Sequence, residues 1–244
     1  MSQRRSCILT YHSLDDSGSV ISTSSATFRE QMSWLAAEGI PVVPLEQIRD
    51  TPGAVAITFD DGFRNFFEQA LPVLERHRFR AAVFIVSGFC GQWNDWPSQP
   101  RHGGIPKLEL MSWEQARQAA AMGIEIGCHT ATHPYLSRLP ASDLENELHR
   151  SRTEIEQRIG APVNAFAYPY GDAPLAVREA AGRAYKLAVS TRLAFVKTGS
   201  DALNLPRLDT YYLRNPLWFR GFTKSYGTAY LSVRRWARSL RQMV

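Results

Sequence analysis

Residues 54–62 read Ala-Val-Ala-Ile-Thr-Phe-Asp-Asp-Gly, an apolar run that ends abruptly in two carboxylates. The run does not alternate with polar residues, which is typical of a strand buried on both faces. A helical pattern over residues 63–77 follows directly. A doubly buried strand followed by a helix is the unit from which parallel α/β sheets are built, so this stretch predicts an α/β fold.

The same unit recurs on both sides of this stretch. Short apolar runs lie at residues 7–11, 40–43, 81–86, 124–128, 165–168 and 187–190, and helical patterns lie at 27–38, 112–122, 141–159 and 174–184. About seven parallel strands without a long break predict one closed or nearly closed (β/α) barrel, with an open doubly wound sheet as the alternative. We expect the barrel to occupy residues 1–212 and a basic helical segment to occupy 213–244.

The two carboxylates, Asp60 and Asp61, come at the end of their apolar run. Catalytic groups sit at the carboxyl ends of strands in barrel folds. Adjacent carboxylates there are costly unless a cation or hydrogen-bond donors neutralise them. The alternative is an N-terminal cap of the following helix, for which Asp is well suited. This pair by itself leaves both interpretations open.

A second polar cluster, Gly-Cys-His-Thr-Ala-Thr-His at residues 127–133, also ends an apolar run. His129 and His133 are separated by three residues, a spacing found at metal sites. Two histidines with one carboxylate form a known catalytic-metal ligand set. Ordinary hydrogen-bonded histidines are the alternative, but the Asp pair at another strand end favours a metal.

The third cluster is Phe-Ala-Tyr-Pro-Tyr-Gly at residues 166–171. Pro169 restricts the backbone and Gly171 permits a sharp turn. The backbone N–H of Tyr170 is therefore a candidate donor to an oxyanion. A turn with packed aromatic side chains is the alternative.

In this order the three clusters resemble the polysaccharide deacetylase family (the NodB homology domain, carbohydrate esterase family 4). Its signatures are T-F-D-D-G and H-[ST]-x-x-H, complete here at residues 58–62 and 129–133, and R-x-P-[YF], in which Ala167 replaces the arginine. The resemblance implies a distorted barrel and metal-dependent removal of acetyl groups from N-acetylated sugars. It implies Asp60 as general base and Asp61, His129 and His133 as ligands of a divalent metal, most simply Zn²⁺.

Two departures from the family pattern concern the acid and the missing arginine. The usual C-terminal acid histidine is absent, because no histidine follows His149. His12, at the end of the first apolar run, is similar to the acid histidine of the circularly permuted poly-N-acetylglucosamine deacetylases, so we assign it that role. A structural histidine is the alternative. For the family arginine that orients the catalytic Asp, Arg207 is the candidate replacement.

Residues 87–110 form a connection too long for a plain turn, and long loops in compact domains are usually functional or disordered. Trp93 and Trp96 in this loop are candidates to stack on a sugar, and Tyr168 is a third candidate substrate contact. Anchoring of the loop on the body is the alternative role of the two tryptophans.

The net charge of +5 is unevenly distributed along the 244 residues. Residues 205–244 hold eight basic side chains and one acidic one, a net charge of +7, whereas residues 1–204 carry −2. A nucleic-acid-binding protein would be basic more widely, so we expect no nucleic-acid partner. Residues 226–244 have helical spacing of apolar residues, with Arg234, Arg235, Arg238 and Arg241 largely opposite. This helix either packs on the barrel with its arginines outward or attaches to an anionic membrane surface.

The N-terminus is basic, but the apolar run that follows it is shorter than the apolar region of a signal peptide. Three cysteines do not form a disulfide scaffold. We therefore expect a cytoplasmic protein, with peripheral membrane contact as a further option. The leading hypothesis is a metal-dependent N-deacetylase of a glycan. The alternatives are a catalytically silent carbohydrate-binding barrel and an amidohydrolase that acts on a small non-sugar amide.

Overall fold

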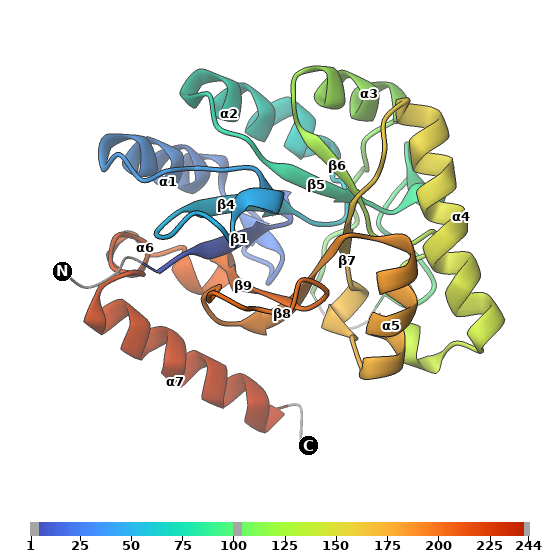
Figure 1. Cartoon of the computed structure of the whole chain (residues 1–244). Helices are drawn as coiled ribbons and strands as arrows, with labels where there is room; N and C mark the ends of the chain where they lie inside the picture. Colours follow the sequence, from blue (N-terminus) through green and yellow to red (C-terminus); the bar gives the residue numbers. More distant parts are fainter. Residues whose placement is uncertain (1–4, 100–103, 242–244) are drawn as a thin grey trace.

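Seven parallel strands close into a barrel in the computed structural model (Figure 1), which describes residues 5–99 and 104–241, with side chains up to Arg238. The barrel strands, in their order around it, are β1 (Cys7–Tyr11), β4 (Val55–Phe59), β5 (Ala82–Ile85), β6 (Glu125–Cys128), β7 (Ala165–Ala167), β8 (Leu187–Leu193) and β9 (Leu205–Asp209). The last strand pairs with the first. This confirms the predicted α/β barrel and excludes the open sheet.

Helices surround the barrel (Figure 1) and lie close to the predicted positions. They are α1 (Ser25–Ala37), α2 (Leu71–His77), α3 (Trp113–Ala121), α4 (Ala141–Ile159), α5 (Leu175–Ala184), α6 (Pro216–Arg220) and α7 (Ser225–Arg241). A π-helical segment, η2 (Phe66–Ala70), precedes α2. The described residues also form short 3₁₀ helices, which are η1 (Leu45–Gln47), η3 (Ser87–Phe89), η4 (Leu136–Arg138), η5 (Pro169–Gly171) and η6 (Thr210–Leu213). A small parallel pair, β2 (Ser13–Leu14) with β3 (Ser22–Thr23), lies outside the barrel.

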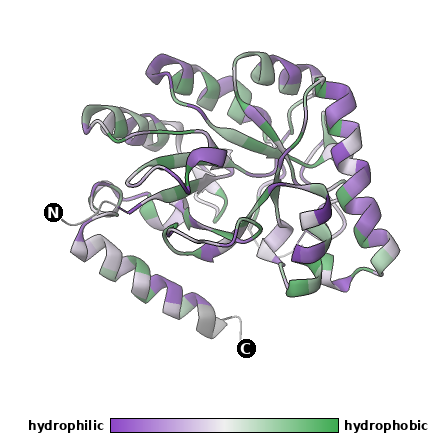
Figure 2. Cartoon of the chain, viewed as in Figure 1, coloured by the Kyte–Doolittle hydropathy of each residue, from purple (hydrophilic) through white to green (hydrophobic). Residues whose placement is uncertain are grey.

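Both faces of the barrel strands are buried, as the absence of alternation predicted. In β1, Ile8 belongs to an apolar cluster inside the barrel with Phe84 and Ala167. Its neighbours Cys7 and Leu9 belong to the larger cluster that the helices cover. Figure 2 shows the difference between layers: the central strands are mostly hydrophobic, whereas α4 at the edge is mostly hydrophilic.

One predicted strand is wrong and one barrel strand was missed. Residues 40–43 are not a barrel strand, because this segment makes only one bridge, between Val42 and Val55. Pro41 lies within this segment and Pro44 follows it, and a proline cannot donate a hydrogen bond to a strand ladder. The seventh strand is instead β9, which was not recognised as an apolar run because it contains Pro206 and two charged residues.

The register of the barrel brings the sequence motifs together at one end. Tyr11 pairs with Phe59, so the residues that follow β1 and β4 are neighbours. Cys128 pairs with Ile85 on one side and Phe166 on the other. The three motifs therefore meet at the carboxyl ends of parallel strands, where barrel enzymes place their catalytic groups.

The C-terminal part contains the helices α6 and α7, but α7 does not pack as predicted. Its buried positions are Gly227 and Leu231, whereas Val233 and Trp236 are exposed. The prediction that the arginines face outward is wrong for Arg234 and Arg238, which are half-buried. Arg241 lies beyond the described side chains. No helix among residues 5–99 and 104–241 is long and apolar enough to cross a membrane.

Candidate active site and metal centre

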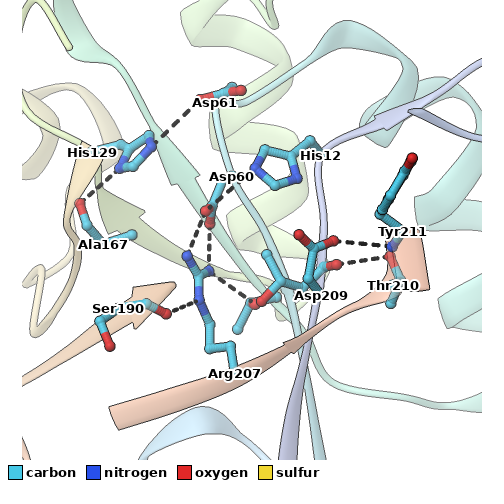
Figure 3. A network of polar contacts seen from close by, with 12 residues as sticks. His12, Asp60, Asp61, His129, Ala167, Ser190, Arg207, Asp209, Thr210 and Tyr211 are labelled. Carbon is cyan, nitrogen blue, oxygen red and sulfur yellow. Dashed lines mark hydrogen bonds and ion pairs between the residues drawn. The ribbon is translucent and has the colours of Figure 1, made fainter. Parts of the chain in front are cut away.

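A buried ion pair occupies the centre of the site (Figure 3). The two terminal nitrogens of the Arg207 guanidinium, Nη1 and Nη2, donate to the two carboxylate oxygens of Asp60, each at 2.6 Å. The two side chains are 2% and 3% exposed, so water screens their attraction little. Burial would raise the pKa of Asp60, but Arg207 holds that pKa well below its usual range. Asp60 is therefore an ionised carboxylate in a fixed orientation.

Arg207 is itself held from two sides. Its Nε donates to the carbonyl of Ser190 at 3.0 Å, and its Nη1 also reaches the Thr58 hydroxyl at 3.3 Å. The guanidinium lies 6.0 Å above the ring of Phe84 inside the barrel. Ala167, where the family motif has arginine, belongs to the same interior cluster as Phe84. A small side chain there leaves interior space in which Arg207 approaches Asp60 from β9.

His12 lies beside Asp60 because β1 and β4 are paired in register. The backbone N–H of Asp60 donates to the Tyr11 carbonyl at 3.0 Å, which aligns the residues that end the two strands. The Nε2 atom of His12 is 3.8 Å from the Asp60 carboxylate. With 23% of its side chain exposed, His12 is the most accessible of the polar groups around Asp60 and can reach both the carboxylate and the solvent.

Asp61, His129 and His133 form a group that could bind a metal ion. One ligand atom from each lies within 4.8 Å of the other two, and all three residues are buried. The Nε2 atoms of His129 and His133 are 3.4 Å and 3.5 Å from the same oxygen of Asp61. Figure 3 shows Asp61 and His129 facing each other above Asp60.

The orientation of the two histidines fits a bound cation. His129 Nδ1–H donates to the Ala167 carbonyl at 2.7 Å, which directs its Nε2 toward Asp61 and makes Nε2 the atom that would bind a metal once its proton is lost. Burial, reinforced by His129, lowers the pKa of His133 to about 3, so that ring is neutral. The two Nε2 atoms lie 3.2 Å apart, and a cation between them would satisfy both lone pairs and the charge of Asp61.

Backbone strain is concentrated at this site. Among the described residues, five non-glycine positions have positive φ, and four of them are Asp61, Thr130, His133 and Tyr170. Such conformations cost of the order of 1–3 kcal/mol each and persist where surrounding contacts enforce them. Glu147 of α4 supplies such contacts by accepting from the backbone N–H groups of Ala131 and Thr132 at 2.8 and 3.0 Å. The loop that carries both histidines is thus held rigidly.

The third motif and the long loop pack against the histidines. Tyr170, with φ of 58°, turns sharply after Pro169, and its ring lies edge-on to His133. Trp96 is 3% exposed and stacks on the other side of His133 at 4.3 Å. The structure does not bring Trp93 to this place: it is 42% exposed and bridges to Glu109 within the loop.

A cavity of about 530 Å³ opens over these groups. His12, the Asp pair, both histidines, Trp96, Tyr168 and Tyr170 line it, and so do Arg234, Ala237 and Arg238 of α7. Tyr168 is nearly buried and its hydroxyl donates to the Leu203 carbonyl at 2.9 Å. Of the candidates from the sequence, all except Trp93 and Arg207 line this cavity, and Arg207 is buried and acts on the site through Asp60. Thr130, Glu147 and the α7 residues were not among the candidates. Thr130 occupies the [ST] position of the H-[ST]-x-x-H signature, whereas Glu147 and the α7 residues belong to none of the three motifs.

Comparison with known proteins agrees with this arrangement. The family model described as polysaccharide deacetylase matches residues 47–187, more than half of the chain. The chain belongs to the polysaccharide deacetylase family. Within the family match lie Asp60, Asp61 and the two histidines, whereas His12 and Arg207 lie before and after it. The two groups that flank Asp60 thus come from opposite ends of this family member.

The chain is similar to curated deacetylases over part of their length. It is 24% identical over 206 residues to the poly-beta-1,6-N-acetyl-D-glucosamine N-deacetylase of Staphylococcus aureus (strain MRSA252), covering 77% of this chain and 67% of that protein. Identity to the Escherichia coli (strain K12) protein of the same name is 27% over 143 residues, covering 52% of this chain. The chain spans only 21% of the length of that relative.

Solved structures show the same fold. The structure of IcaB from Ammonifex degensii superimposes with a TM-score of 0.75 and 23% identity, covering 92% of this chain and 98% of that one. The closed barrel is therefore shared with a solved relative, and the helices around it are part of the same overall arrangement.

Proposed function

We propose that this protein is a metal-dependent N-deacetylase that removes acetyl groups from N-acetylated amino sugars of a polysaccharide, an oligosaccharide or a lipid-linked glycan. The observation that carries the proposal is the buried Asp60 carboxylate, fixed by Arg207 beside the Asp61–His129–His133 group in one cavity. An ionised base next to a set of metal ligands is the arrangement that metal-assisted amide hydrolysis requires. The curated relatives named above, which act on a poly-N-acetylglucosamine, support the substrate class.

Asp61, His129 and His133 would hold the metal, for which we propose Zn²⁺ because the ligand set is two imidazoles and one carboxylate. When bound, the ion would supply a Lewis acid and make water a better nucleophile at neutral pH. Asp60 accepts the proton of the attacking water, and Arg207 keeps that carboxylate oriented. His12 then gives a proton to the departing sugar nitrogen as the C–N bond breaks. The Tyr170 N–H is the proposed donor to the carbonyl oxygen. The products are acetate and a free amino sugar.

The test is acetate release from N-acetylglucosamine oligomers with and without a chelator. We expect release that chelation abolishes, no turnover but retained metal in Asp60→Asn, and loss of metal in His129→Ala. Binding of oligomers without acetate release would indicate a silent carbohydrate-binding barrel. Release from small N-acetylated amides but from no sugar would indicate an amidohydrolase of another class. Absence of both metal and chelator sensitivity would refute the scheme.

We also propose that α7 makes peripheral contact with an anionic membrane. Its side chains Tyr226, Val233 and Trp236 are 42%, 62% and 66% exposed and lie along one face at helical spacing. An exposed stripe of aromatic and aliphatic residues on a basic helix is the pattern of helices that lie in a membrane interface. Residues 205–244 carry a net charge of +7, and although Arg207 is buried against Asp60, the remaining excess of positive charge complements anionic lipid headgroups.

Sedimentation with vesicles that contain anionic phospholipid tests this contact. The wild-type protein should sediment with them at low salt, less at high salt, and less with neutral vesicles. The double variant Val233→Asp, Trp236→Asp should remain in the supernatant. Leu175→Asp is the matched control, because Leu175 is 61% exposed on α5, a different helix. Equal sedimentation of the double variant and the control would reject α7 as the contact.

A further inference from the structure

We propose that Arg234 and Arg238 form an anion-binding subsite at the wall of the catalytic cavity, and that the N-acetylated substrate carries a phosphate group next to its sugar. This inference rests on the proposed deacetylase function and specifies its substrate class. It concerns the C-terminal helix, which lies outside the part of the chain that the family model matches.

The first half of α7 fixes which face the second half presents. Gly227 and Leu231 are buried against the body of the protein. Tyr230 stacks on Trp218 at 4.2 Å, and its hydroxyl donates to the Tyr212 carbonyl at 3.1 Å. Any side chain at position 227 would collide with the backbone of Gly221, so only glycine permits this approach. The helix is therefore docked by a face defined by residues 227, 230 and 231.

Arg234 and Arg238 continue that same face. They lie seven and eleven residues after Gly227, which places them on the docking side at helical spacing. Beyond Leu231 this side of the helix borders the cavity, and Arg234, Ala237 and Arg238 line it. Two half-buried guanidinium groups thus share one cavity with Asp61, His129 and His133.

Neither arginine has a carboxylate partner in the part of the chain that the structure describes. Among the described residues, Arg234 and Arg238 take part in none of the ion pairs, whereas Arg64, Arg178 and Arg207 all do. Arg234 lies over the rings of Tyr212 and Tyr230 at 5.1 and 5.6 Å, and its Nε is buried without a hydrogen-bond acceptor. A partly desolvated cation without an acceptor is unfavourable unless a ligand provides one.

The acidic groups of the cavity are already engaged. Asp60 is bound by Arg207, and Asp61 faces the two histidines. Asp209 accepts from the backbone N–H of Tyr211 at 3.0 Å, as Figure 3 shows. Asp209 keeps its charge but forms no ion pair with Arg234 or Arg238 among the described residues, so neither guanidinium is neutralised by direct contact with a carboxylate of the cavity. Arginine pairs bind phosphate through several parallel hydrogen bonds, which makes phosphate the group that best fits this wall.

The cavity has room for such a substrate. Its volume of about 530 Å³ lies within the range of small-molecule sites, enough for one sugar ring with a phosphate. The acetamide would lie at the metal ligands while the phosphate lies at α7. A sugar phosphate and a sugar joined to a lipid by a phosphate present the same chemistry to these arginines.

Calorimetric titration tests the subsite without relying on turnover. N-acetylglucosamine 1-phosphate and N-acetylglucosamine are titrated into the whole protein, both metal-loaded and chelator-stripped, because phosphate could also bind a metal. The wild type should bind the phosphate form at least about tenfold more tightly in both states, and this preference should weaken with salt. Arg234→Gln with Arg238→Gln should abolish the preference.

The matched control is Arg235→Gln, which removes one charge from the same helix at an exposed position outside this cavity. It should keep the preference for the phosphate form. Equal binding of the two sugars by the wild type, or a preference that survives the double variant, would overturn the subsite. The subsite would also be overturned if Arg235→Gln lost as much of the preference as the double variant does. The preference would then reflect the overall positive charge of the helix rather than a specific site.

Acetate release separates failure of this inference from failure of the proposed function. The substrates are neutral N-acetylglucosamine oligomers, N-acetylglucosamine 1-phosphate and a polyprenyl diphosphate N-acetylglucosamine in detergent. Faster release of acetate from either phosphate-bearing substrate than from the neutral oligomers supports the subsite if the double variant loses this advantage. Whichever of the two is deacetylated faster shows whether the phosphate belongs to a free sugar phosphate or to a lipid-linked sugar. Release from neutral oligomers alone, unchanged in the double variant, overturns the subsite and leaves the deacetylase intact. Release from no substrate refutes the deacetylase, while the titrations still decide on anion binding.

Discussion

Asp60 keeps its negative charge in the barrel interior only because Arg207 binds both of its oxygens. The two residues are 147 positions apart in the sequence, so no local motif contains the pair. Removing one partner of a buried pair leaves an uncompensated charge and is far more damaging than replacing both. The position of the base therefore depends on a residue of the last barrel strand.

We expect Arg207→Ala to lower the free energy of unfolding by about 3–5 kcal/mol, the usual cost of breaking a buried pair. Acetate release should fall at the same time, because Asp60 loses its fixed orientation. Adding Ala167→Arg to Arg207→Ala should recover part of both, since position 167 faces the same interior cluster. Urea unfolding and acetate release measure the two effects.

Ala167→Arg in the wild-type background is the control for this rescue. It adds a large side chain to a filled interior, so it should destabilise the protein rather than stabilise it. A double variant no more stable or active than Arg207→Ala would show that position 167 cannot reach Asp60.

At the scale of elements, β6 begins with an acidic residue at the end of the barrel opposite the site. Glu125 is largely buried, and burial, reinforced by the nearby Glu46, raises the pKa of its carboxyl to about 7. The folded state then binds a proton that the unfolded state releases near pH 4.5. Stability contributed by this group is present below about pH 4.5 and is lost as the pH rises to 7.

Glu125→Gln should remove this pH dependence. Relative to the wild type, the variant should gain roughly 1–3 kcal/mol of unfolding free energy at pH 8 and little at pH 4.5. Urea unfolding at pH 4.5, 6 and 8 measures the difference. Glu75→Gln, an exposed change on α2, is the control and should show no such trend. A constant difference between Glu125→Gln and the wild type at all three pH values would contradict the raised pKa.

Elements with local signals could be predicted from the sequence, and those defined by tertiary contacts could not. Ser112 and Gln115 form a capping box, a spacing that can be read directly in the sequence. Ser142 and Glu145 have the same spacing but form no cap, because α4 already begins at Ala141 after Pro140. The docking face of α7 could not be predicted, since helical periodicity shows an amphipathic pattern without showing which side meets the barrel. The close approach of Gly227 decides that.

The site as a whole shows the same division. Asp60, Asp61, His129 and His133 each end or follow a strand in a recognisable motif, so the parallel barrel brings them together without further information. His12 and Arg207 become neighbours of Asp60 only when β1 pairs with both β4 and β9. Arg234 and Arg238 reach the cavity only through the docking of α7. The more a residue's position depends on barrel closure and helix docking, the less its place in the site can be predicted from the local sequence.

For the whole molecule, we expect a bound divalent metal to raise the melting temperature. Asp61, His129 and His133 would bind a cation in the folded state only, because folding brings their ligand atoms within 4.8 Å of one another. A ligand at 100 times its dissociation constant stabilises by about 2.7 kcal/mol, which for a chain of this size corresponds to a rise of roughly 5–10 °C. Differential scanning calorimetry with Zn²⁺ and with chelator measures it.

Two variants make this prediction specific to the site. His133→Ala should abolish the zinc-dependent rise, whereas His149→Ala, an exposed histidine paired with Glu145 on α4, should retain it. Burial opposes a charge on His129, but the Asp61 hydrogen bond outweighs it and raises the pKa of that imidazole. Protons therefore compete with the metal, and the rise should shrink as the pH falls toward 5. A rise that persists in His133→Ala, or that grows at low pH, would place the metal elsewhere in the molecule.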